Sequence, residues 1–120
     1  MSKGARMSTD CTFCRIAAGE APADVVAADD EFVAFRDAHP RAPVHLIVMP
    51  RQHVTSLDVV EQLGSDAAGR LLRFIAMLAR EQGVHETGYR VVTNIGPDAG
   101  QEVFHLHWHL MGGRRLGDMA

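Results

Sequence analysis

The segment 105–111 alternates strictly between histidine and apolar residues, and this alternation constrains the chain more than any other feature of its sequence. Residues two apart in a β-strand point to the same face of the sheet. The three imidazoles are therefore predicted to share one face, and they belong to His105, His107 and His109. The apolar residues between them are predicted to point into a core, and they are Leu106, Trp108 and Leu110.

Aligned imidazoles serve either metal binding or phosphorus chemistry. A single metal ion held by all three is disfavoured, because His105 and His109 would stand on the order of 13 Å apart along an extended strand. Two of the rings with ligands from elsewhere, as in a metal enzyme of the cupin type, stay open. In phosphorus chemistry, a neutral imidazole attacks the phosphorus atom and a second imidazole protonates the departing group. A merely exposed histidine-rich strand would not need an apolar residue at every intervening position, so that alternative is disfavoured.

The loop before this segment favours phosphorus chemistry. Gly96 and Gly100 leave backbone amides free to approach oxyanions, and Gln101 adds a side-chain donor. Together with the histidines, these donors predict a site that binds a phosphate group and reacts with it.

The remaining pattern predicts one α+β domain, which suits a chain of 120 residues. Residues 1–10 are small and polar and are predicted to form a disordered tail. A short helix is expected over 11–19, with Asp10 as its cap, and a long helix over 65–82. Strands are predicted over 25–28, 31–37, 45–49, 89–95 and 102–111. These elements predict a mostly antiparallel sheet of about five strands with one long and one short helix.

Charge and hydropathy exclude several classes of protein. Twelve Lys and Arg against fifteen Asp and Glu give a net charge of −3, which argues against a protein that grips the nucleic acid backbone. No apolar run approaches the ~18 residues that a membrane helix needs, and the first ten residues hold no apolar stretch typical of a secretory signal. We therefore expect a cytoplasmic enzyme or binding module that binds neither nucleic acid nor membrane.

The chain resembles the histidine triad (HIT) superfamily, and within it the branch of histidine triad nucleotide-binding proteins. The family motif, His-φ-His-φ-His-φ-φ with φ hydrophobic, matches residues 105–111 at every position. Further segments match in the family's order: FCRI (13–16), AFRD (34–37), APVH (42–45), VMPRQH (48–53), YRVVTN (89–94) and GQEV (100–103). The resemblance implies a HIT domain over 11–120 and a homodimer in which two sheets join into one.

The resemblance also implies an activity. Such a protein would hydrolyse purine nucleoside phosphoramidates or related nucleotide conjugates and release the nucleoside monophosphate, with no cofactor required for catalysis. By resemblance, His107 is the nucleophile and forms a nucleotidyl-histidine intermediate that water then hydrolyses. His109 would hydrogen-bond the phosphate and help protonate the leaving amine. His105 and His45 would form a supporting pair that orients and polarises the site.

Substrate contacts follow from the same matches. Asp37 would bind both ribose hydroxyls, although a carboxylate there could also simply cap the end of a strand. Phosphate or leaving-group contacts are implied for Asn94, Gln101 and the Val103 backbone. Apolar contacts with the base are implied for Phe13, Ile16 and Phe35, for which simple core packing is the alternative. Glu102 departs from the family, where serine is common, because a carboxylate repels a phosphate unless it turns away or is protonated.

Two cysteines lie close together, and with no signal segment they are expected to be reduced. A thioredoxin-like role is disfavoured, because no strand precedes Cys11. Some relatives with this pair hold a structural zinc, and the matching ligands here are Cys11, Cys14, His53 and His105. Plain buried thiols with a surface His53 remain the alternative.

Other functions stay open at this point. A sister branch of the family cleaves dinucleoside polyphosphates, and a nucleotide-sensing module with incidental turnover would keep the same residues. His39 and His85 are expected to be solvated and carry no functional prediction.

Overall fold

The computed structural model describes residues 11–118. The expected disordered tail therefore lies outside the described residues. The first helix, α1 (Thr12–Ala17), is capped by Cys11 rather than Asp10, because the helix starts one residue later than expected. The Cys11 Sγ accepts a hydrogen bond from the Cys14 amide at 3.3 Å. The cap of α1 is thus one of the two cysteines that were candidate metal ligands.

Five strands form one antiparallel sheet in the order β2-β3-β4-β6-β5. Their bounds are β2 (Val25–Ala28), β3 (Phe32–Arg36), β4 (Val44–Pro50), β5 (Tyr89–Val92) and β6 (Trp108–Gly112). The predicted α+β class with a mostly antiparallel sheet is confirmed. The strand order places β6, the strand that carries the end of the histidine motif, between the central strand β4 and the edge strand β5.

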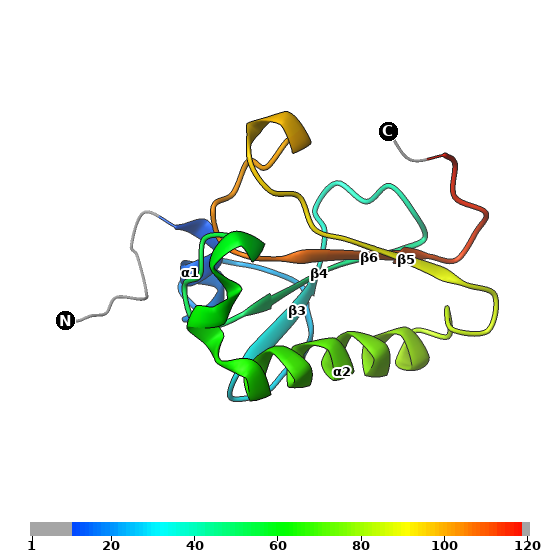
Figure 1. Ribbon diagram of the computed structural model, residues 1–120. Coiled ribbons are helices and arrows are strands. Elements are labelled where there is room, and N and C mark those ends of the chain that lie inside the picture. Colours follow the sequence, from blue (N-terminus) through cyan, green and yellow to red (C-terminus); the bar gives the residue numbers. More distant parts are fainter. Residues whose placement is uncertain (1–10, 119–120) are drawn as a thin grey trace.

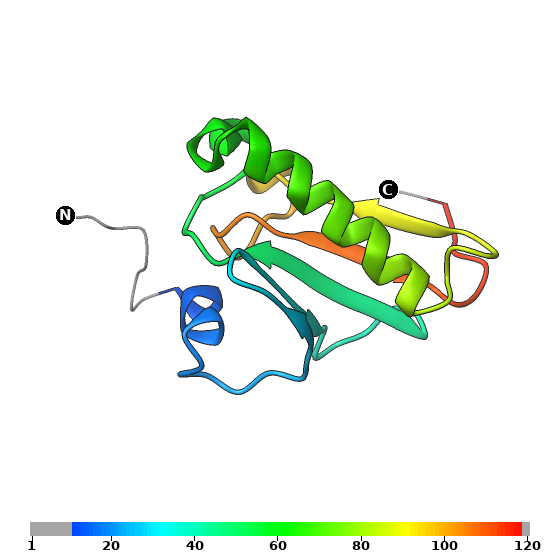
Figure 2. The same ribbon diagram turned by 90° about the horizontal axis from the view of Figure 1, so that it is seen from below.

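One face of the sheet is covered by the long helix α2 (Ser65–Glu81), which runs along it in Figures 1 and 2. The buried side chains of this helix follow its periodicity of three and four residues, and they are Leu71, Phe74, Ile75, Leu78 and Ala79. They pack against alternate strand residues that share one face of the sheet, namely Phe32, Ala34, Leu46, Val48 and Leu110. This packing forms the main core and leaves the other face of the sheet available for a site.

On that other face, one row of paired residues runs across four strands of the sheet. Phe35 pairs with Ile47, Ile47 pairs with His109, and His109 pairs with Val92. Directly opposed residues in antiparallel strands lie on the same face, so this row places a triad histidine between apolar side chains. At one end of the face, Phe13 of α1 packs on this layer and closes a second, smaller core.

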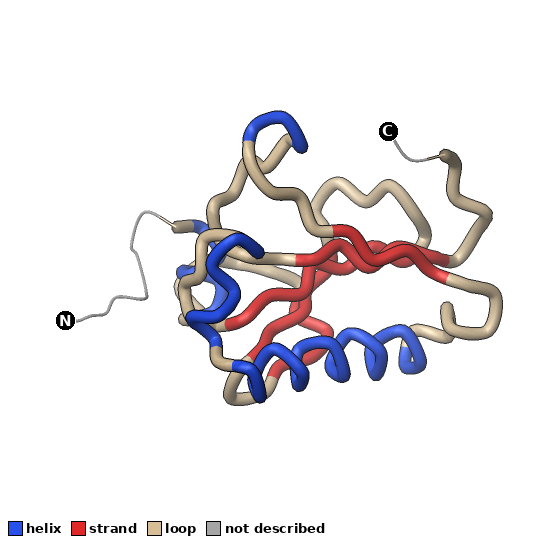
Figure 3. Tube along the Cα trace, viewed as in Figure 1, coloured by secondary structure: helices blue, strands red, loops and turns tan. Residues whose placement is uncertain are grey.

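The last strand is shorter than the predicted 102–111. Residues 102–107 carry no strand assignment, and in Figure 3 the strand begins only after a stretch of loop. The reason is that this segment bonds to loops instead of to a neighbouring strand. The Leu106 amide donates to the Val54 carbonyl at 2.6 Å, and the Thr93 hydroxyl donates to the His107 carbonyl at 2.7 Å. Thus only His109 of the triad lies on a regular strand.

Two short 3₁₀ segments complete the described chain. The connection between β4 and α2 contains η1 (Leu57–Leu63), and the loop between β5 and the histidine segment contains η2 (Pro97–Ala99). Above the sheet in Figure 1, loops and the C-terminal segment surround the face that α2 leaves uncovered. Within residues 11–118, no helix is long and apolar enough to cross a membrane.

Candidate active site

A cleft of about 770 Å³ lies on the sheet face opposite α2, and it contains both His107 and His109. A second cavity of about 530 Å³ adjoins it. The two cavities share three lining residues, which are Phe13, Asp37 and Ile47. The predicted base contacts Ile16 and Phe35 line the smaller cavity, whereas Asn94, Gln101 and Val103 line the larger one. The cleft is therefore divided into an apolar part and a polar part that meet at Asp37.

His107 is held with a defined tautomer. Its Nδ1 lies 2.7 Å from the main-chain carbonyl of His105, and since a carbonyl can only accept, Nδ1 carries the proton. The neutral ring then has its lone pair on Nε2. The ring is only 8% exposed, and its burial lowers its pKa, although the hydrogen bond to His105 acts in the opposite direction. The edge of Phe13 fixes the plane of the ring at a centroid distance of 4.9 Å. This is the form that a nucleophilic imidazole requires.

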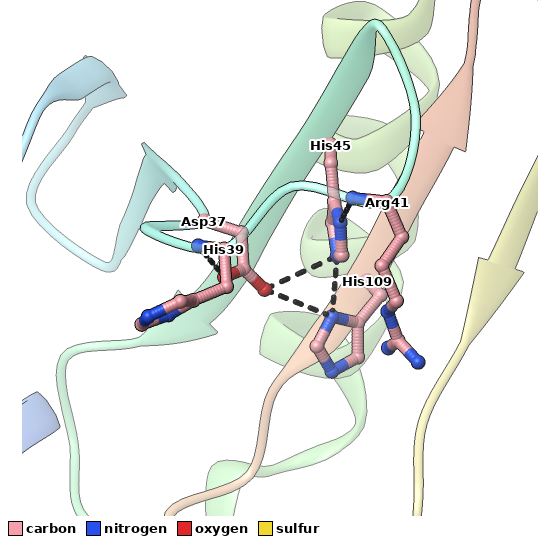
Figure 4. Close-up of polar contacts among 5 residues, drawn as sticks. All are labelled: Asp37, His39, Arg41, His45 and His109. Atoms are coloured by element: carbon pink, nitrogen blue, oxygen red, sulfur yellow. Dashed lines mark hydrogen bonds and ion pairs between the residues drawn. The ribbon is translucent and has the colours of Figure 1, made fainter.

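His109 is held in the opposite tautomer by a chain of contacts that begins at Arg41, shown in Figure 4. The Arg41 amide donates to Nδ1 of His45 at 3.0 Å, so the proton of the neutral His45 ring lies on Nε2. That Nε2 lies 2.9 Å from Nδ1 of His109, which therefore accepts and leaves the His109 proton on Nε2. His107 and His109 thus offer one lone pair and one N–H donor to the same cleft.

Burial keeps the imidazole rings of His109 and His45 neutral. Desolvation is the main cause that lowers the pKa of His109 to about 4, and the neighbouring His107 and His45 lower it further. The pKa of His45 is also lowered, again chiefly by burial. The single N–H of the neutral His45 ring is therefore shared between Nδ1 of His109 and Oδ2 of Asp37, 3.2 Å away, and its contact with the carboxylate is not an ion pair.

The shift of His109 predicts that the metal-free protein loses stability in acid. The unfolded chain protonates this ring near its ordinary pKa of 6.5, whereas the folded protein does so only near pH 4. Between these values the unfolded state binds more protons, so the free energy of unfolding should fall as pH decreases from 6.5 to 4. The expected loss from this ring is about 3 kcal/mol. Chemical denaturation at several pH values would measure it, and His109→Asn should have a shallower pH dependence; an equally steep curve would contradict the assignment.

The same tautomers test whether a metal ion fits at Asp37, His45 and His109. Their ligand atoms lie within 4.8 Å of one another. However, Nε2 of His45 carries the proton, because its Nδ1 accepts the Arg41 amide, and a protonated nitrogen cannot ligate a metal. The donor set of this cluster therefore does not fit a cation.

The His105 side chain lies apart from the other two rings of the triad. It is fully buried, lines neither of the two cavities, and its Nε2 donates to the Pro50 carbonyl at 2.8 Å. Its Nδ1 faces the two thiols, 3.4 Å from Cys11 Sγ and 3.5 Å from Cys14 Sγ. In this structure the contact of His105 with the nucleophile is its main-chain carbonyl, whereas the resemblance implied an orienting role for its ring.

The four candidate zinc ligands converge. Nδ1 of His53 lies 3.1 Å from Cys14 Sγ, and all four ligand atoms lie within 4.8 Å of one another. A tetrahedral zinc with two sulfur and two nitrogen ligands needs atoms at about this spacing. The hydrogen bond from His105 Nε2 to Pro50 is also typical of a metal-bound histidine, because it leaves Nδ1 free to ligate. The residues present therefore fit a zinc ion.

Asp37 caps the end of a strand and also lines the cleft. Its Oδ1 accepts the His39 amide at 2.9 Å, which caps the end of β3. Its side chain is 17% exposed and stands where the two cavities meet. The capping hydrogen bond involves only Oδ1, and the carboxylate lines the cleft.

Gln101 uses its side chain within the loop. Its Oε1 accepts the Gly96 amide at 2.9 Å, and its Nε2 donates to the carbonyls of Thr55 and Val103. The side-chain amide that was expected to donate to a ligand instead holds the loop around Gly96 in place. Glu102 is exposed at the rim of the same cleft.

Sequence reasoning missed several residues of the cleft, among them Ile47 and Arg41. Ile47 lies between Phe35 and His109 in the paired row, and the alternation of residues 44–50 could have placed it there. Arg41 acts through its backbone amide, which has no signal in the sequence.

The sequence is similar to those of several known proteins. A family model described as the HIT domain matches residues 18–116. A purine nucleoside phosphoramidase of Escherichia coli (strain K12) is 39% identical over 113 residues, covering 94% of this chain and 95% of the relative. A 14 kDa zinc-binding protein of Brassica juncea is 41% identical over 109 residues, covering 89% and 96%.

Solved structures show the same fold. A HIT family hydrolase from Clostridium thermocellum superimposes with a TM-score of 0.88 at 34% identity, covering 94% of this chain and 98% of that one. A histidine triad protein from Clostridium difficile also gives a TM-score of 0.88, at 41% identity and with the same coverage.

Proposed function

The chain belongs to the HIT domain family and is a nucleotide hydrolase of that family, and we propose that it cleaves purine nucleoside phosphoramidates to the nucleoside monophosphate. The observation that carries this proposal is the pair of opposite tautomers at one cleft, a lone pair on His107 and an N–H on His109. A phosphoramidate needs both, because its phosphorus must be attacked while its leaving amine acquires a proton.

In the first step, Nε2 of His107 attacks the α-phosphorus, and the bond between phosphorus and the leaving nitrogen breaks. His109 hydrogen-bonds the phosphate through Nε2. An anionic phosphate beside this ring favours its imidazolium form, since an opposite charge stabilises it. The added proton comes from solvent and lies on Nδ1, so Nε2 of His45 then donates to Oδ2 of Asp37 alone. The imidazolium gives one proton to the leaving amine, which departs neutral.

In the second step, water attacks the phosphorus of the nucleotidyl-histidine, and the bond to His107 breaks. His109 now accepts a proton from the attacking water and returns to its starting form. The carbonyl of His105 holds His107 throughout, so the same nitrogen serves as nucleophile and then as leaving group.

Asp37 is proposed to hold the ribose, and this predicts a substrate-dependent effect. Replacing Asp37 with Asn should reduce kcat/KM for an adenosine phosphoramidate, while the 2′,3′-dideoxy analogue should be far less affected. Hydrogen bonds to a charged group are worth about 1.5–3 kcal/mol, so the ribose preference should fall by roughly tenfold to a hundredfold. The measurement is kcat/KM for both substrates. An equal loss on both would mean that Asp37 acts only through His45 and His109.

The substrate class is tested by comparing adenosine 5′-phosphoramidate with diadenosine polyphosphate, with a chelator present. The proposal predicts faster cleavage of the phosphoramidate at a rate that the chelator leaves unchanged. Faster cleavage of the polyphosphate would favour the sister activity, and binding without cleavage of either would favour a sensing role. A rate that is lost with chelator and restored by metal would favour a metal enzyme.

Zinc is proposed for the cysteine and histidine cluster described above. When bound, it would supply four bonds that tie α1 to the loop after β4 and to the histidine segment. Since Phe13 and Ile16 of α1 line the two cavities, the metal would hold the wall of the base site in place. No step of the reaction uses it.

The protein is also proposed to form a homodimer. Exposed apolar residues on α2 and on the edge strand β5 support this, and they are Leu72, Met77, Tyr89 and Val91. Light scattering on the full chain would measure the mass of the particle, and a monomer would overturn the proposal.

A further inference from the structure

Three arginines line the larger cavity but not the smaller one. Arg41 comes from the loop before β4, Arg90 from β5, and Arg114 from the segment after β6. Among the described residues, 11–118, none of the three forms an ion pair with a carboxylate. Three acidic residues, Asp37, Glu102 and Asp118, line the same cavity, and none of them forms an ion pair with these arginines within the described residues. Three guanidinium groups that are not directly paired with a carboxylate therefore gather from three separate segments.

Backbone contacts hold two of these arginines in place. Arg114 Nη2 donates to the Arg41 carbonyl at 2.7 Å, and Arg90 Nη2 donates to the Gly117 carbonyl at 2.8 Å. A carbonyl accepts a hydrogen bond but does not neutralise a full positive charge. The Arg41 amide is bonded to His45, and Figure 4 shows its side chain extending from that contact toward His109. The cluster is thus built onto the same elements that hold the reactive rings.

The position of the cluster along the cleft follows from the register of the sheet. His45 pairs with Met111, and Met111 pairs with Arg90. These three residues form the next row on the same face of the sheet as Ile47 and His109, two residues further along each strand. The apolar cavity is reached through Phe13, Asp37 and Ile47. A nucleotide with its base in the apolar cavity and its phosphorus at His107 would therefore direct its leaving group toward the arginines.

We propose that Arg41, Arg90 and Arg114 form a subsite for an anionic group on the leaving amine, either a carboxylate or a phosphate. This inference rests on the proposed phosphoramidase activity and names the substrate class within it. The unpaired guanidinium groups match such anions in geometry as well as charge. Arg41 is the specificity-determining member, because its side chain makes no hydrogen bond within the described residues that would compete with a ligand.

The test uses three adenosine 5′-phosphoramidates whose leaving amines are β-alanine, its neutral amide, and O-phosphoethanolamine. The wild-type protein should have a kcat/KM about threefold to tenfold higher for each anionic amine than for the neutral amide, and the preference should shrink with added salt. The two anionic amines distinguish a carboxylate from a phosphate as the preferred group. Arg41→Gln keeps the backbone amide and should remove most of the preference, whereas Arg41→Lys should keep part of it.

Arg73→Gln is the matched control, because it removes one positive charge from the exposed side of α2 on the opposite face of the sheet. It should leave the preference unchanged. An equal kcat/KM for all three substrates in the wild type would overturn the subsite while leaving the phosphoramidase activity standing. A loss in Arg41→Gln that is equal for all three would also overturn it, because Arg41 would then serve the nucleotide phosphate. Failure to cleave any of the three would instead count against the proposed function.

Discussion

Replacing His107 with alanine is expected to reduce hydrolysis of adenosine 5′-phosphoramidate by about a thousandfold or more, because the variant loses the attacking nitrogen. The remaining side chains can still bind the substrate, so the loss should appear in kcat rather than in KM. The measurement is release of adenosine monophosphate with a chelator present. Acid quenching of the wild-type reaction should trap a nucleotidyl group on His107, visible by mass spectrometry.

Two controls make this result specific. His107→Gln keeps a polar side chain of similar length, which guards against a loss caused by a cavity in the buried site. His85→Ala removes an exposed ring outside the site and should retain full activity. If His107→Gln cleaves the substrate at the wild-type rate, or if the trapped group lies on another residue, His107 is not the nucleophile.

Replacing Cys14 with serine is expected to abolish zinc binding and the stability that zinc provides. Cys14 is buried and its Sγ contacts both ligand histidines, so its loss removes the central ligand of the cluster. At free zinc a thousandfold above its Kd, bound metal stabilises the folded state by about 4 kcal/mol. Zinc content by elemental analysis and thermal unfolding with and without chelator would measure the effect.

Thr12→Ala is the matched control, because Thr12 lies between the two cysteines and is exposed. It should bind zinc as the wild type does. A wild-type protein that takes up no zinc, and whose unfolding is indifferent to chelator, would make the cluster a set of buried thiols and histidines. The catalytic prediction for His107 is independent of that outcome, since His107 is not among the four ligands.

Local patterns were enough to predict most of the fold. The periodicity of residues 65–82 predicted the buried stripe of α2, because a helix places every third or fourth side chain on one face. Alternation in 31–37 predicted a strand, and β3 indeed sends Phe32 and Ala34 to one core and Val33 and Phe35 to the other. The strand predicted over 102–111 is absent over 102–107. There the backbone hydrogen-bonds to loop residues far along the chain, such as Val54, instead of to a neighbouring strand.

The sequence by itself determined which residue types are available and which face of an element they share, since both depend only on neighbours along the chain. The tertiary structure decided what each imidazole can do. His105 and His107 follow the same pattern, yet one faces two thiols and the other lines the cleft. The tautomers of His45 and His109 depend on one backbone amide of Arg41. A proton's position is set by the partner that the fold brings within 3 Å, and no periodicity encodes that partner.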